Sequence, residues 1–359
     1  MEQCKGLIAG IDIGYSKIQA SVYSYNSRNV QTVKLTEDSK EKTSLANVVA
    51  ECMRATGTSQ IQSICVTIPD YHFDEISAVR DTLKKCGVSD GRWQVLSRVE
   101  SFAYYAYSQK KELYQNGTVL MDYNASGIDV YRLYCNKIGD MQYILQEHTL
   151  SQPEGSTIEK ASHSVTLYMT EYFKKHRASS VYLTGMGFDV DRLPDEFTKV
   201  LVAGRKAFVG QNLYVRGACF AALEYISPQV FGNVCLLTDG RIKADIETDI
   251  SEHGRPMKFR IVKMGTNWYM AERTIDFIIE DVSVINFQII WPDGKYIEKQ
   301  VDISSIPYRE GKTTRISMNV KASSQDKCIV TVKDLGFGEI YQASDSVIVE
   351  ELDLSEADV

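Results

Sequence analysis

The sequence lacks the signatures of several protein classes. None of its eight cysteines forms a C-x-x-C pair, and its five histidines show no metal-ligand spacing. Both absences argue against a disulfide frame and a zinc site, so we expect the cysteines to be small core residues in a reducing compartment. No apolar run approaches the roughly 18 residues of a membrane span, and the N-terminus has no signal-peptide core. We therefore expect a cytoplasmic protein without a membrane span.

Basic residues are not in excess either. Lys and Arg number 40 against 47 Asp and Glu, which gives a formal net charge of -7. Because nucleic-acid binders normally present a basic face, this balance argues against a nucleic-acid partner. Hydrophobic residues make up 44% and charged residues 24% of the 359 positions, which is ordinary for a soluble globular protein. The length allows two domains.

Two aspartates, each of which closes an apolar strand and opens a turn, are the most informative feature of the chain. Asp12 closes the run 7–11, and Asp122 closes the run 118–121. A second strand-like run follows each turn, so the sequence predicts a strand, an acidic turn and a strand, given twice.

Hydrophobic spacing predicts alternating strands and helices up to about residue 226. Hairpins followed by strand–helix units, twice over, predict a duplicated α/β domain with a cleft between its halves. Strands are expected on both sides of each acidic turn and at 61–68, 93–96, 141–145 and 180–184, and helices at 43–56, 73–87, 100–107, 157–173 and 214–225.

After residue 227 the texture changes to alternating strands separated by turn residues, which predicts a small antiparallel β-sandwich. The sequence thus predicts an α/β domain over 1–227, an all-β sandwich module over 228–349 and a frayed acidic tail over 350–359. The expected strands of the sandwich are 242–250, 257–262, 275–280, 284–291, 314–320 and 328–333.

Six short motifs occur in one order: the two acidic turns, the strand–proline segment 66–69, the helix starts 99–103 and 216–222, and the glycine turn 181–187. In this order they resemble the ATPase domain shared by DnaK-type chaperones, actin and the bacterial actin homologues of cell division. The resemblance implies a duplicated actin-like ATPase (ribonuclease H-like) domain.

The resemblance extends beyond residue 226. Residues 234–239 sit where a DnaK-type chaperone has its hydrophobic interdomain linker, and the strands after them look like the substrate-binding β-sandwich of that family. The segment 334–340 is similar to one in an uncharacterised bacterial family with this architecture. These parallels imply that a protein or an extended peptide binds to the sandwich.

The resemblance implies a site for ATP or ADP with Mg²⁺, in which Asp12 and Asp122 hold the metal through water and Glu100 orients an attacking water. Other readings stay open: the aspartates and glycines as ordinary turn residues, and Glu100 as an acid favoured at a helix start. The residues that the resemblance assigns to the nucleotide are Asp12, Gly14, Tyr15, Ser16, Lys17, Asp122, Asn124, Ser126, Gly185, Gly187 and Gly217.

Departures from the family pattern set the functional expectation. Tyr15 stands where a Thr is normal, and residues 123–126 replace a glycine-rich turn, so backbone N–H groups approach phosphates less closely. The intervals between motifs are shorter than in the chaperones. We therefore expect a DnaK-like scaffold or chaperone-like protein that is non-catalytic or binds nucleotide weakly, and at most a slow ATPase. The alternatives are a pseudo-ATPase without any cofactor, a nucleotide-switched peptide-binding chaperone and, with less support, a sugar kinase.

Overall fold

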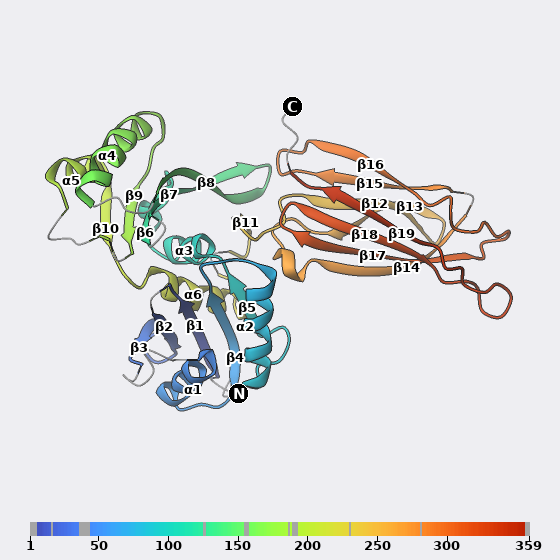
Figure 1. The fold of residues 1–359 in the computed structure, drawn as a ribbon, viewed down its shortest axis with the longest axis horizontal. Coiled ribbons are helices and arrows are strands. Elements are labelled where there is room, and N and C mark those ends of the chain that lie inside the picture. The colour runs from blue at the N-terminus through green and yellow to red at the C-terminus, as the bar shows by residue number, and fades with distance from the viewer. Residues whose placement is uncertain are drawn as a thin grey trace. The chain divides into compact units, whose positions relative to one another are not determined.

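The chain forms two compact units in the computed structural model (Figure 1). The first unit comprises Met1–Lys137 and Ile144–Val234, and the second comprises Ile138–Tyr143 and Cys235–Val359. The structure describes residues 6–15, 17–35, 44–124, 127–153, 158–185, 187–188, 193–229, 231–280 and 282–355.

The first unit is built around two mixed sheets that repeat one strand order. One sheet has the order β3-β2-β1-β4-β5, in which β1 pairs antiparallel with β2 and parallel with β4. The other has the order β10-β9-β6-β7-β8-β11, in which β6 pairs antiparallel with β7 and parallel with β9. The series β3-β2-β1-β4-β5 therefore recurs as β8-β7-β6-β9-β10. The predicted α/β domain with mixed sheets is confirmed.

The strands of these two sheets are mostly those that the apolar runs predict. Short strands at 29–33 and 206–209 were not predicted, because each is largely exposed and carries little apolar pattern. The bounds are β1 Leu7–Ile13, β2 Ile18–Ser24, β3 Asn29–Val33, β4 Ile61–Thr67, β5 Trp93–Leu96, β6 Thr118–Asn124, β7 Gly127–Ile138, β8 Met141–Pro153, β9 Ser180–Thr184, β10 Lys206–Val209 and β11 Val234–Leu237.

Capping residues fix the starts of two helices in this unit. Ser44 accepts the N–H of Asn47 at the start of α1, and Ser97 accepts the N–H of Glu100 at the start of α3. Helices α3 and α6 lie between the two sheets (Figure 1), and α6 contacts α3, β1 and β4. The helices are α1 Leu45–Thr56, α2 Phe73–Lys85, α3 Arg98–Tyr107, α4 Ile158–Lys175, α5 Asp195–Val202 and α6 Leu213–Ile226, with a 3-10 turn η2 at Lys111–Leu113.

Gly217 brings α6 and α3 into close contact. A Cβ built on Gly217 would lie 1.8 Å from the carbonyl oxygen of Ser101, where no side chain fits. The resemblance assigned Gly217 to a bound cofactor, and the structure corrects this assignment. Gly217 is buried against the backbone of α3 and is not among the residues that line the cavity described below.

Replacement of Gly217 by Ala is expected to destabilise the first unit by about 1–3 kcal/mol, because the added methyl group forces the two helices apart. Urea unfolding followed by the fluorescence of Trp93, which is buried in β5, measures the change. Gly232→Ala is the matched control, since a Cβ there meets only Pro228, at 3.8 Å. Equal stability of the two variants would contradict the close-packing role.

The second unit contains two four-stranded antiparallel sheets, with the orders β13-β12-β15-β16 and β14-β17-β18-β19. Alternate residues of β17 and β18 are buried, so one face of that sheet supplies core side chains. The strands are β12 Asp245–Glu252, β13 Arg255–Val262, β14 Glu272–Ile279, β15 Val284–Ile290, β16 Tyr296–Asp302, β17 Thr314–Ser324, β18 Lys327–Asp334 and β19 Val347–Asp353, with a 3-10 turn η4 at Trp268–Met270.

The start of the expected acidic tail is a strand. Residues 350–353 belong to β19, which pairs antiparallel with β18, so the prediction of a frayed segment is wrong there. Leu352 is fully buried opposite Cys328, whereas Glu350 and Glu351 are exposed. The acidic residues occupy the solvent side of a strand that one apolar side chain anchors to the core. In the described part of the chain, no helix is long and apolar enough to span a membrane.

Candidate functional site

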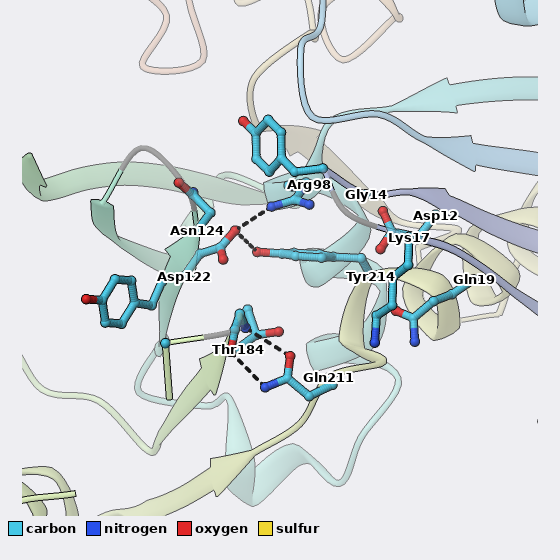
Figure 2. Close-up of a pocket in the computed structure, with 14 residues that line it drawn as sticks. Asp12, Gly14, Lys17, Gln19, Arg98, Asp122, Asn124, Thr184, Gln211 and Tyr214 are labelled. Carbon is cyan, nitrogen blue, oxygen red and sulfur yellow. Dashed lines mark hydrogen bonds and ion pairs between the residues drawn. The ribbon is translucent and has the colours of Figure 1, made fainter. Parts of the chain in front are cut away.

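A cavity of about 470 Å³ opens in the first unit, where β1, β6 and β9 end (Figure 2). The structure brings the two acidic turns and the glycine turn to this one cavity, as the sequence predicts. Ser16 and Ser126 lie outside the described residues. The assigned residues that line the cavity are Asp12, Gly14, Tyr15, Lys17, Asp122, Asn124, Gly185 and Gly187.

Glu100 does not join this group. Its side chain is fully buried in the first turn of α3 and is absent from the cavity lining. The role of orienting an attacking water at the cavity is therefore not supported by its position. The other reading, an acid in the first turn of a helix, agrees with where it lies.

Arg98 is the main residue of the site that the sequence did not reveal. Its Nη1 donates to Oδ2 of Asp122 at 3.0 Å, and the hydroxyl of Tyr214 donates to the same oxygen at 2.7 Å (Figure 2). The guanidinium carbon lies 4.7 Å from the ring centre of Tyr15 and 5.0 Å from that of Tyr214. Arg98 is thus held by one carboxylate and stacked by two aromatic rings.

One signal in the sequence could have pointed to Arg98. It is the first residue of α3, and the N-terminus of a helix carries partial positive charge. A cation at that position is unfavourable unless a carboxylate lies nearby. The chain itself therefore asks for an acidic partner, and Asp122 supplies it.

The two aspartates have raised pKa values. Burial raises the pKa of Asp12 to about 6; the Asp122 carboxylate adds to the rise, and Arg98 and Lys17 oppose it. Burial also raises the pKa of Asp122, against the lowering by the Arg98 charge and the hydrogen bond from Tyr214. Among the described residues, Oδ1 of Asp12, Oδ1 of Asp122 and Nε of Arg98 are buried without a hydrogen-bond partner. These three atoms are free to contact a ligand.

Replacement of Asp12 by Asn is expected to stabilise the protein at pH 7.5 by about 2–3 kcal/mol, the equivalent of a shift of roughly two pKa units. Above pH 6 the carboxylate is charged in the folded and the unfolded chain, and only burial penalises it. Below the model value of 3.8 it is neutral in both states, so the gain should vanish as the pH falls from 6 to 4. Urea unfolding at pH 4 and pH 7.5 tests this, and a variant less stable than wild type at pH 7.5 would contradict it.

The glycine turn is filled by Tyr123. A Cβ on Gly187 would lie 1.9 Å from Cδ1 of the Tyr123 ring, and a Cβ on Gly185 would lie 2.1 Å from the Tyr123 carbonyl oxygen. The Tyr123 ring also meets Phe188 edge to face, with ring centres 5.6 Å apart. In this structure the two glycines therefore make room for a side chain of the protein itself.

Gln211 holds the same turn from the other side. Its Nε2 donates to the carbonyl oxygen of Gly185 at 2.8 Å, and its Oε1 accepts the N–H of Gly185 at 3.2 Å. Within the described ranges, no group of three or more His, Cys, Asp or Glu side chains is arranged to hold a metal ion. The pair Asp12 and Asp122 could contact a cation only through water or together with a ligand.

Residues 21–239 match the model of a family of unknown function, DUF5716, in its C-terminal part, and the chain belongs to this family. Residues 241–354 match a domain of unknown function, DUF8552. No curated protein matches the chain. The two matched ranges correspond closely to the two compact units.

Solved structures with a similar arrangement cover about three-fifths of the chain. A ROK hexokinase from Thermus thermophilus has a TM-score of 0.43 and 13% identity, over 62% of this chain and 100% of the hexokinase. The ethanolamine utilization protein EutJ from Carboxydothermus hydrogenoformans has a TM-score of 0.37 and 14% identity, over 62% and 91%. The activator of 2-hydroxyisocaproyl-CoA dehydratase from Clostridium difficile, with bound ADPNP, has a TM-score of 0.33 and 14% identity, over 61% and 94%. The fold described above rests on the sheet order and not on these scores.

Proposed function

We propose that the first unit is an actin-like nucleotide-binding domain that binds ATP or ADP weakly and hydrolyses ATP very slowly or not at all. The observation that carries the proposal is the ion pair of Arg98 with Asp122 inside the cavity. Catalysis of phosphoryl transfer depends almost wholly on positioned charges and a metal ion. A carboxylate that is already bound to Arg98 and Tyr214 is poorly placed to serve a metal.

The residues present fit a nucleotide without fitting rapid turnover. Lys17 and Arg98 are cations at the cavity, suited to phosphate groups, and the partnerless oxygens of Asp12 and Asp122 suit the water shell of Mg²⁺. When bound, Mg²⁺ would neutralise charge on the phosphates. The carboxylate of Glu100, which is buried away from the cavity lining, supplies no base there.

For the second unit we propose a scaffold or chaperone-like role in the cytoplasm, in which a protein or an extended peptide pairs with a strand edge. The support is β19, which stands last in its sheet and exposes Val347 and Val349. A DnaK-type chaperone that is switched by nucleotide remains the finer alternative. A peptide array probed with the full chain tests the role, since specific capture of extended apolar peptides favours the chaperone and silence favours the scaffold.

Calorimetric titration of the full chain with Mg-ADP and Mg-ATP, together with an ATPase assay, tests the proposal for the first unit. Weak binding without appreciable hydrolysis is expected. A turnover rate in the ordinary kinase range, about 1–100 s⁻¹, that is lost in Asp12→Ala would refute the non-catalytic reading. Failure of both nucleotides to bind would refute the nucleotide-binding proposal itself.

A further inference from the structure

The ion pair between Arg98 and Asp122 faces a cavity large enough for a ligand, so its partners are open to exchange. A negatively charged ligand group competes with Asp122 for the guanidinium, and a cation competes with Arg98 for the carboxylate. The outcome depends on which of the two groups can take a new partner at the smaller cost.

Arg98 can take an anion without leaving its place. A guanidinium has five N–H donors, and Nη1 is the one that bonds Asp122, whereas Nε has no partner among the described residues. Nη2 lies 3.6 Å from the position of a Cβ on Gly14, and so beside the first acidic turn. The stacking of the guanidinium by Tyr15 and Tyr214 can persist while the free donors turn to a phosphate.

A divalent cation faces a larger cost at the same point. To bind Asp122 fully, it must take Oδ2 from both Arg98 and Tyr214, and it must stay close to a guanidinium that the two rings hold in place. The repulsion between that cation and Arg98 is strong because the pair is largely buried.

We infer that Arg98, and not a divalent cation, is the positive charge with which this cavity binds the phosphate groups of its ligand, and that Asp122 is an internal competitor that keeps the affinity low. The inference rests on the proposed function for the phosphate-bearing nature of the ligand. It predicts phosphate binding that does not require Mg²⁺. It also predicts that loss of the Asp122 charge strengthens binding.

The chain offers a matched control cluster outside the cavity. Nη1 of Arg132 lies 3.4 Å from Oε2 of Glu147, and the hydroxyl of Tyr172 donates to the same oxygen at 3.1 Å. This cluster has the same three residue types as the cavity cluster, with Glu in place of Asp, and none of its members lines the cavity. Glu147→Gln therefore removes an equivalent charge from an equivalent pair in the same unit.

The experiment is calorimetric titration of the full chain with inorganic pyrophosphate and with ADP, at fixed ionic strength, in EDTA and again in Mg²⁺. Asp122→Asn is expected to bind pyrophosphate about tenfold more tightly than wild type in EDTA. Glu147→Gln should bind as wild type does. The double variant Arg98→Gln/Asp122→Asn, which keeps the net charge of the wild-type pair and leaves no buried charge unpaired, should lose the gain.

Three results would overturn the inference: Asp122→Asn binds no more tightly than wild type, the double variant keeps the gain, or binding requires Mg²⁺ and disappears in Asp122→Asn. Failure of the proposed function looks different. If wild type binds no nucleotide and Asp122→Asn binds pyrophosphate in EDTA, the inference holds and the proposed function fails. If wild type binds Mg-ADP and Asp122→Asn shows no gain, the reverse is true.

Discussion

Replacement of Arg309 by Met is expected to lower the stability of the second unit by about 3–5 kcal/mol, because it leaves the carboxylate of Asp334 buried without its cation. Nη1 and Nη2 of Arg309 donate to Oδ1 and Oδ2 of Asp334 at 2.8 and 2.6 Å, and the two side chains are only 5% and 0% exposed. Asp334 also accepts the N–H groups of Gly336 and Ser344, so the pair organises the loop after β18.

Arg315→Met is the control for this prediction. Arg315 pairs with Asp276 at 3.1 Å in the same sheet, but both side chains are about half exposed, so its loss should cost less than about 1 kcal/mol. Urea unfolding followed by the fluorescence of Trp268 and Trp291, which are both buried in the second unit, measures the two variants. Similar losses in the two variants would contradict the special role of the buried pair.

The same pair gives the second unit a defined response to acid. The hydrogen bonds from Arg309 lower the pKa of Asp334 below its model value of 3.8, with further lowering by the two backbone N–H groups. A lowered carboxyl pKa contributes stability that is fully present above 3.8 and is lost as the pH falls through the folded-state value. In Arg309→Met the acid-unfolding midpoint of the second unit should therefore move to higher pH.

Replacement of Arg98 by Gln is expected to destabilise the first unit by about 3 kcal/mol, since Asp122 then keeps the hydrogen bond from Tyr214 but loses its counter-charge. The double variant Arg98→Gln/Asp122→Asn should recover most of the loss, because it leaves no unpaired buried charge. Arg132→Gln removes the more exposed pair with Glu147 and should cost less. Trp93 fluorescence in urea reports all three, and a double variant no more stable than Arg98→Gln would contradict the explanation.

Much of the first unit could be predicted because its signals are local. Asp12 and Asp122 each end an apolar strand, and this pattern alone placed both turns at one cavity. Arg98 was missed because its partner is 24 residues away in the chain and no local pattern links a helix start to a strand end. Partnership between charges is a tertiary property, and the sequence shows only that each charge needs one.

The glycine turn shows a second limit of sequence patterns. The two glycines at 185 and 187 correctly indicate that something approaches the backbone closely, but not what approaches it. The structure shows that Tyr123 does. The strand β19 was missed for a different reason: acidic residues on its exposed side mask the buried Leu352 in the average composition of the segment.

The cation cluster at the cavity has a consequence for the order of events during folding. Asp122 gains one donor from 24 residues earlier in the chain and the other, on Tyr214, from 92 residues later. Contacts of such separation form late, because loop closure opposes them until nearby structure is in place. Substitutions in the cluster should therefore speed unfolding more than they slow refolding. On the ribosome, a nascent chain that ends before Tyr214 lacks this donor for the Asp122 carboxylate.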